Sequence, residues 1–177
     1  MFITGIGSRE TPRPILDEMT KIGEWIANNG HTLRSGHADG ADLFFEMGAS
    51  GAAEIFLPWS GFNKTYPVLG KRFVFDKDSS VAPQCRELIL KHHPAPRALS
   101  RGAWFLMGRN CFQILGPDLT NPSSMVICWT KGGKLIGGTS FAMRIAMEYK
   151  IPIINMAVDT YRTANSVIEY INENNKH

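Results

Sequence analysis

The sequence predicts an α/β fold in which helices cover both faces of a mostly parallel sheet, and three observations carry this prediction. Short apolar runs of strand length alternate with longer segments whose apolar residues recur at helical spacing. Residues 124–129 form a nearly continuous apolar run, as in a strand buried on both faces. Glycine-rich stretches follow three of the apolar runs. We therefore expect residues 1–177 to form one three-layer domain of about five strands, with an insertion after the third.

The first half of the chain follows the order strand, helix, strand, helix, strand. The first strand starts at Phe2 and runs into glycines, and Pro12 and Pro14 then lie where a first helical turn tolerates proline. The sequence Asn28-Asn29-Gly30 is a helix stop signal. The later elements expected here are a helix over 12–29, a strand over 31–34, a helix over 39–50 and a strand over 53–57. This order indicates parallel strands joined by right-handed crossovers.

Residues 59–96 interrupt this alternation. A short strand over 71–75 and a helix over 81–92 are the regular elements that we expect within them. A connection of this length is more often functional than idle. The insertion is therefore expected to lie over the carboxyl edge of the sheet or against a second subunit, and a homo-oligomer, a dimer or larger, is expected.

The second half returns to alternating elements. Gly116 and Pro117 stop a long helix. The elements expected are a helix over 97–115, a strand over 124–129, a glycine-rich segment over 130–139, a helix over 140–149, a strand over 151–155 and a closing amphipathic helix over 160–174.

The composition is that of a globular protein. Hydrophobic residues make up 44% and charged residues 20%, and the net charge of +3 is too small to indicate nucleic-acid binding by itself. No apolar run is long enough to span a bilayer, and the start lacks the pattern of a signal peptide. The three cysteines show no CxxC spacing, so we expect reduced thiols, no metal site and no cofactor. A cytoplasmic protein without a membrane partner is expected.

Polar residues and glycines follow three of the predicted strands. The carboxyl ends of parallel strands meet at one edge of the sheet, where helix N-termini can bind a phosphate or carboxylate. The candidate ligand-binding residues are Gly7, Ser8 and Arg9 after the first strand, Ser35, Gly36, Asp39, Gly40 and Asp42 after the second, and Gly137, Gly138 and Thr139 after the fourth. A plain strand-to-helix turn capped by Asp39 and Asp42 is the alternative for the second group.

Two of these stretches resemble a known family. The run Gly7-Ser8-Arg9 after the first strand, and Ser-Gly-His-Ala-Asp-Gly-Ala-Asp at 35–42 after the second, resemble the SLOG superfamily, the Rossmann-like domain shared by DNA-processing protein A and the Lonely Guy phosphoribohydrolases. The resemblance implies a Rossmann-like fold and a nucleotide-derived ligand. It also implies that Arg109 and Asn110 enter the site from the helix over 97–115. A surface arginine whose stem covers apolar neighbours is the alternative for Arg109.

The glycine-rich segment before residue 140 resembles the family's glycine-glycine-x-glycine-threonine run but departs from it at one place. In Lonely Guy enzymes a catalytic glutamate follows three residues after the threonine, whereas this sequence has Ala142 there. Three functions therefore remain open. The first is a receptor or sequestering protein for a nucleotide or a nucleotide-derived phosphorylated molecule. The second is an N-glycosidase or phosphoribohydrolase in which Asp42 or Glu46, four residues apart on one helix face, replaces the missing acid.

The third function is single-stranded DNA binding, as in DNA-processing protein A. It requires a basic stripe interleaved with aromatic side chains on which bases can stack. The candidates are Lys64, Lys71, Arg72, Arg97 and Arg101, with Tyr66 and Phe73. The modest net charge favours the small nucleotide-type partner over nucleic acid.

Overall fold

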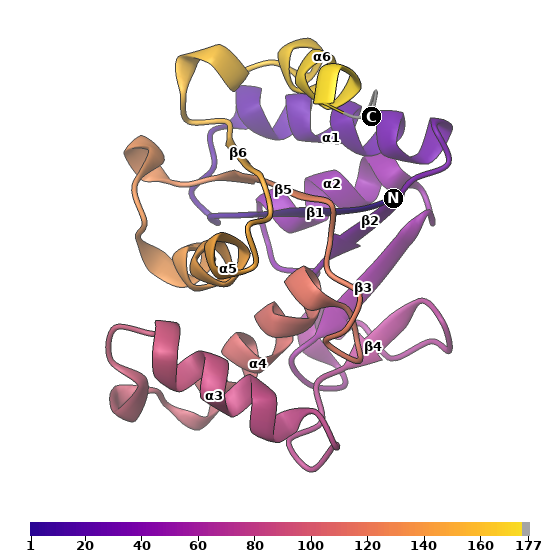
Figure 1. Cartoon of the computed structure of the whole chain (residues 1–177). Coiled ribbons are helices and arrows are strands. Elements are labelled where there is room, and N and C mark those ends of the chain that lie inside the picture. Colours follow the sequence, from indigo (N-terminus) through magenta and orange to yellow (C-terminus); the bar gives the residue numbers. More distant parts are fainter. Residues whose placement is uncertain (175–177) are drawn as a thin grey trace.

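The computed structural model describes residues 1–174, and its centre is a six-stranded parallel sheet (Figure 1). The strands are β1 (Phe2–Gly7), β2 (Thr32–Ser35), β3 (Ala53–Leu57), β4 (Arg72–Val74), β5 (Met125–Trp129) and β6 (Ile153–Asn155). They lie in the order β4-β3-β2-β1-β5-β6, so the chain builds outward from β1 on one side and then returns to its other side with β5. The strand order thus reverses between β1 and β5, which is where open α/β sheets form a crevice.

The sheet confirms the predicted α/β class and corrects the strand number from about five to six. The additional strand, β4, comes from the insertion, at the place where a short strand was expected. It pairs in parallel with β3, with Phe56 opposite Phe73, and forms one edge of the sheet. The insertion therefore contributes to the sheet itself.

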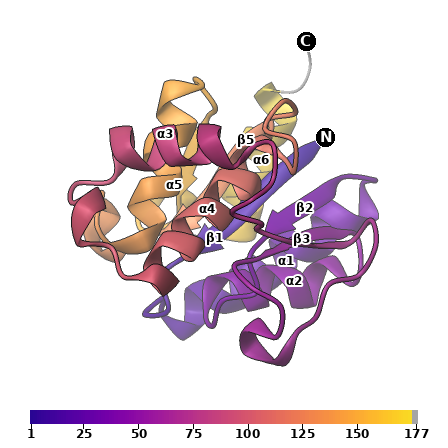
Figure 2. The same cartoon turned by 90° about the horizontal axis from the view of Figure 1, so that it is seen from below.

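Helices cover both faces of the sheet, as Figures 1 and 2 show. One face carries α1 (Arg13–Asn28), α2 (Ala41–Ala49) and α6 (Ala164–Asn174), and the other carries α3 (Ala82–His92), α4 (Arg101–Leu115) and α5 (Gly137–Glu148). Each layer buries its own apolar cluster against the sheet. Within residues 1–174, no helix combines the length and the apolar composition needed to cross a membrane.

Two glycines of β1 let α2 lie directly on the strand. A Cβ added to Gly5 would come within 2.7 Å of the ring of Phe45, and one added to Gly7 would lie 2.6 Å from the Cβ of Ala41. Real Cβ atoms do not come so close, so any side chain at these positions would push the helix away from the sheet. Because α2 lies this close, its first turn brings Asp42 to the carboxyl end of β1.

The helix starts differ from the sequence-based expectations by three or more residues at three places. One of them is α6, which was expected from residue 160 but begins at Ala164, after a 3₁₀ turn at Asp159–Tyr161. A 3₁₀ turn at Pro96–Ala98 precedes α4, which begins only at Arg101, where the Ser100 hydroxyl caps it by accepting from the Ala103 N–H at 3.2 Å. In contrast, α5 begins three residues earlier than predicted, at Gly137. The segment 137–139, expected as a turn before the helix, is therefore its first turn.

Part of the insertion lies over the carboxyl edge of the sheet, which is one of the two positions predicted for it. The Asn63 amide donates to the His37 carbonyl at 2.8 Å, and the Thr65 hydroxyl lies 2.7 Å from Nε2 of His37, so this part covers the loop after β2. The remainder does not lie there, because β4 extends the sheet and α3 packs in the layer of α4 and α5. The alternative position, against a second subunit, stays a prediction.

Candidate functional site

A cavity of about 460 Å³ opens where the strand order reverses, at the carboxyl ends of β1 and β5. Its walls come from the loop after β1, the first turn of α2, the middle of α4 and the segment from the end of β5 into α5. The predicted ligand-binding residues that line it are Gly7, Ser8, Arg9, Asp42, Arg109, Asn110, Gly137, Gly138 and Thr139. The structure thus brings together residues from four distant parts of the chain. Their role in binding stays a prediction.

Four other predicted residues lie behind the wall or outside the cavity, and they shape the loop after β2. The Ser35 hydroxyl is fully buried and donates to the Gly5 carbonyl at 2.8 Å, which ties β2 to β1. Asp39 is exposed. A Cβ on Gly40, whose φ is +86°, would lie 2.9 Å from Cα of Arg9, so this glycine lets the loop pack against the turn after β1.

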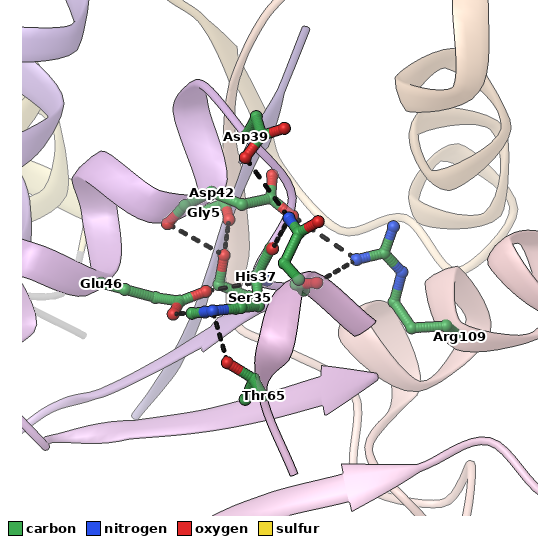
Figure 3. A network of polar contacts seen from close by, with 10 residues as sticks. Gly5, Ser35, His37, Asp39, Asp42, Glu46, Thr65 and Arg109 are labelled. Carbon is green, nitrogen blue, oxygen red and sulfur yellow. Dashed lines mark hydrogen bonds and ion pairs between the residues drawn. The ribbon is translucent and has the colours of Figure 1, made fainter. Parts of the chain in front are cut away.

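Gly36 is the fourth of these residues, and it makes room for a side chain from α4. Nη1 of Arg109 donates to the Gly36 carbonyl at 2.6 Å, and the same nitrogen lies 3.6 Å from Oδ2 of Asp42 (Figure 3). Arg109 is only 6% exposed, which contradicts the alternative of a surface arginine. The cavity wall therefore contains a buried guanidinium that is held in place by a main-chain carbonyl.

The charge of Arg109 is only partly compensated. Burial lowers the pKa of Arg109, and the nearby Arg9 lowers it further, whereas Asp42 and Glu46 oppose both effects. Asp42 is the one acidic group within ion-pair distance in the described part of the chain, and its separation of 3.6 Å is longer than a hydrogen bond. Two arginines thus line the same cavity, and Asp42 is the carboxyl group beside Arg109.

Asp42 is an acid with a strongly altered proton affinity. Burial raises its pKa from 3.8 to about 6, and Glu46 adds to this effect, while Arg109 and hydrogen bonds from the main chain of Ala38 and Gly7 lower it. Burial disfavours the charged carboxylate because it removes the surrounding water. Near neutral pH, a fraction of Asp42 therefore stays protonated, whereas an ordinary surface aspartate is almost fully ionised.

Glu46, the second catalytic candidate, is engaged elsewhere. Its carboxylate accepts from the main-chain N–H of His37 at 2.8 Å and lies 2.7 Å from Nδ1 of the same residue, while the other ring nitrogen contacts Thr65 (Figure 3). His37 has a φ of 56°, in the left-handed region, and these contacts hold it there. Glu46 thus joins α2 to the loop after β2, and it does not line the cavity.

The first turn of α5 closes the cavity opposite β1. Within residues 1–174, the helix begins at Gly137 without a side-chain cap, so no capping side chain occupies its first N–H groups. Nδ2 of Asn110 donates to the Gly138 carbonyl at 3.3 Å and thereby ties α4 to this turn. Ala142 also lines the cavity, at the position where the resembling enzymes carry a glutamate. This wall therefore offers main-chain donors and no acid.

Four further lining residues with polar side chains were not predicted as ligand-binding: Glu10, Gln113, Thr130 and Lys131. Thr130 and Lys131 directly follow β5, so the rule that ligands bind at the carboxyl ends of strands could have identified both. Asn155 of β6 fixes Thr130 by donating to its hydroxyl at 2.7 Å and accepting from its N–H at 3.3 Å. Gln113 lies one helical turn after Arg109 and shares its face of α4.

Two buried nitrogen atoms in this wall lack a hydrogen-bond partner within residues 1–174. They are Nε of Arg109 and Nε2 of Gln113, whose side chains are 6% and 1% exposed. Leaving a buried donor unpaired costs about 1–3 kcal/mol, so each such group calls for an explanation. Both residues belong to the part of α4 that lines the cavity.

The residues considered for single-stranded DNA binding lie away from the cavity lining. Tyr66 is 63% exposed. The ring of Phe73 is partly buried and stacks on that of Phe56, with centroids 5.4 Å apart. Of the two aromatic candidates, only Tyr66 is therefore freely available to stack on a base.

Comparison with known proteins shows the fold alone. No protein-family model and no curated protein sequence matches the chain. DNA processing protein A from Helicobacter pylori, whose structure was described for its binding of single-stranded DNA, superposes with a TM-score of 0.59 at 17% identity, over 98% of this chain and 73% of that one. The Moco carrier protein of Chlamydomonas rheinhardtii superposes with a TM-score of 0.52 at 15% identity, over 98% of this chain and 83% of that one.

Proposed function

We propose that this protein binds a nucleotide or a nucleotide-derived phosphorylated molecule in the cavity between β1 and β5, as a receptor or sequestering protein. The observation that carries this proposal is the pair of arginines at the cavity. Arg109 is buried in its wall without a hydrogen-bonded carboxylate, and Arg9 lies close enough to lower its pKa. An anion between the two guanidinium groups relieves this repulsion, and phosphate suits guanidinium donors.

The rest of the cavity fits the same class of molecule. The uncapped start of α5 presents main-chain N–H groups and the positive end of the helix dipole to the cavity. The volume of about 460 Å³ lies within the range of small-molecule sites. The structural neighbours are described as binding single-stranded DNA and, by name, as carrying Moco, so related folds serve ligand binding. These features support a phosphorylated ligand together with the SLOG resemblance of the sequence.

The experiment is a calorimetric titration of the purified protein with four nucleoside 5′-monophosphates, their nucleosides and inorganic phosphate. We expect at least one monophosphate to bind, and its nucleoside to bind at least tenfold more weakly, because one charge-assisted contact is worth about 1.5–3 kcal/mol. Arg9→Ala should weaken the binding of the monophosphate by about tenfold or more. Arg13→Ala is the matched control, because Arg13 is also exposed, pairs with Asp17 and lies outside the cavity.

Three outcomes would contradict this function. Nucleosides that bind as tightly as their monophosphates would show that phosphate is not recognised. Equal losses in Arg9→Ala and Arg13→Ala would show that only the net charge matters. Tight binding of an oligothymidylate with no binding of any monophosphate would instead favour the single-stranded DNA function.

A second candidate, an N-glycosidase acting on a nucleoside phosphate, is favoured by Asp42. A carboxyl group whose pKa is about 6 and which lines the cavity suits a general acid. In such a reaction the bond between C1′ and the base nitrogen breaks and Asp42 donates its proton to the departing base. Water then adds its oxygen to C1′ and gives up a proton, which restores the Asp42 carboxyl group. Ala142 leaves the cavity without the glutamate of the resembling enzymes, so Asp42 is the one acid that we assign to this role.

Chromatography of each nucleoside monophosphate after incubation with the protein separates the two functions. The receptor proposal expects intact nucleotide. Release of free base by the wild type that is lost in Asp42→Asn, with binding retained, would replace it with the glycosidase. Glu46→Gln is the matched control, since Glu46 lies one helical turn away and outside the cavity.

A further inference from the structure

An ion pair spans the mouth of the cavity. Nζ of Lys131, in the segment after β5, lies 3.8 Å from Oε2 of Glu10, in the loop after β1. Both residues line the cavity, and their side chains are 76% and 73% exposed. The pair therefore connects the two loops that flank the point where the strand order reverses.

We propose that Lys131 is a ligand-binding residue that exchanges Glu10 for the phosphate of the bound molecule. Glu10 forms the ion pair with Lys131 while the cavity is empty. Its negative charge also repels anions that bind too weakly to displace it from the lysine. This inference rests on the proposed function, and it adds two selectivity-determining residues that face each other across the entrance.

The energetic cost of this exchange is small. An exposed ion pair contributes only about 0–1 kcal/mol, because water already solvates both charges. A phosphate near Lys131 also meets Arg9, Arg109 and the start of α5, which all line the same cavity. The lysine therefore exchanges a single weak partner for a ligand that several other groups also hold.

The local backbone leaves Lys131 free to reorient. Gly132 and Gly133 follow it directly with φ values of 62° and 70°, which glycine adopts without strain. A Cβ at Gly132 would meet only the flexible side chain of Lys134, at 4.0 Å, and one at Gly133 only that of Val158, at 3.9 Å. Neither glycine is closely packed by a neighbouring segment, and the exposed lysine can move toward the cavity without disturbing the core.

The chain offers a matched control for the lysine. Lys134 lies three residues further along the same segment, carries the same charge and does not line the cavity. Lys131→Met and Lys134→Met therefore remove the same charge from the same loop, and only the first removes it from the mouth. Glu10→Gln removes the competing carboxylate while keeping its size.

The test is calorimetric titration of these variants with inorganic phosphate, the four nucleoside 5′-monophosphates and their nucleosides at low salt. Lys131→Met should weaken the binding of monophosphates by about fivefold, the upper range for an exposed charge pair, and Lys134→Met should leave it unchanged. Glu10→Gln should strengthen it, and this gain should shrink in the Lys131→Met background. Near 1 M salt, where the screening length is about 3 Å, these differences should disappear.

Each outcome decides between the inference and the proposed function. If the wild type binds a monophosphate and Lys131→Met binds it equally well, Lys131 does not contact the phosphate and only this inference fails. If Glu10→Gln strengthens monophosphate binding equally in the wild-type and Lys131→Met backgrounds, Glu10 acts only by repelling the phosphate. The proposed exchange of partners by Lys131 would then be wrong. If no phosphate compound binds to the wild type, the proposed function fails and the inference fails with it. Thermal melting of every variant should match the wild type, because both side chains are exposed.

Discussion

The main-chain carbonyl of Gly36 accepts a hydrogen bond from Nη1 of Arg109, and a Cβ at Gly36 would lie only 1.6 Å from that same nitrogen. The φ of Gly36 is not in the left-handed region, so the turn itself does not require glycine here. The absence of a side chain makes room for a guanidinium that comes from α4. The loop after β2 and the cavity wall are therefore fixed together by this pair.

Gly36→Ala should displace Arg109 and destabilise the protein by about 1–3 kcal/mol, as overpacking in a closed site does. Denaturant unfolding measures this loss. In the background of Arg109→Ala the same substitution should cost clearly less, because the clashing side chain is gone. An equal cost in both backgrounds would place the strain of Gly36→Ala elsewhere in the loop.

Two glycines of α4 should respond in opposite ways to alanine. A Cβ on Gly108 would lie 2.4 Å from the ring of Phe75, whereas one on Gly102 would meet no atom within 4 Å. Gly108→Ala is therefore expected to destabilise the fold by about 1–3 kcal/mol. Gly102→Ala should stabilise it by up to about 1 kcal/mol, because alanine favours a helix. Similar melting temperatures for the two variants would argue against the packing of α4 on the segment after β4.

The stability of the protein should depend on pH through Asp42. Burial favours the neutral carboxyl group and raises its pKa to about 6, so its contribution is complete below the ordinary value of 3.8 and is lost as the pH rises through about 6. Relative to Asp42→Asn, the wild type should lose on the order of 2–3 kcal/mol of unfolding free energy between about pH 4 and pH 7. Denaturant unfolding of both proteins across this pH range tests the prediction. Parallel curves of unfolding free energy against pH would contradict it.

His37 should titrate above its ordinary value of 6.5. The hydrogen bond to Glu46 raises the pKa of His37 more than burial lowers it. The stability that this pair adds is full below 6.5 and is lost as the pH rises through the raised value. Glu46→Gln should bring the pKa down, as measured by NMR of the imidazole protons. His31, whose burial lowers its pKa, serves as the internal reference and should not move. A shift of both histidines would indicate a general change of structure.

The sequence allowed the elements to be predicted because their signals are local. Apolar periodicity and stop signals located the strands and helices within a few residues, including β4 and α3 inside the insertion. The predicted start of α5 was wrong, because the glycines at 137–138 are typical of a turn although they belong to the first turn of the helix. The residue at which a helix begins is poorly defined by local sequence, because helix ends shift easily by one or two residues.

The site was predictable only in part, because several of its residues depend on contacts between distant segments. Arg9, Asp42 and Arg109 were identified, and they line one cavity. Gly36 was expected to admit a phosphate, but the space beside it holds a guanidinium from a helix 73 residues further along. Gln113 belongs to no motif that marks it in the sequence. It lines the cavity because it shares a helix face with Arg109.

The pairing of β1 with β5 has a consequence for protein synthesis. Ile3 lies opposite Met125 and Gly7 opposite Trp129, so the paired residues of these neighbouring strands are 122 positions apart in the sequence. While the ribosome is still translating the middle of the chain, the side of β1 that β5 will cover remains an unpaired strand edge. Contacts between residues so far apart in sequence also slow folding. The cavity is therefore completed only after α5 has emerged from the ribosome.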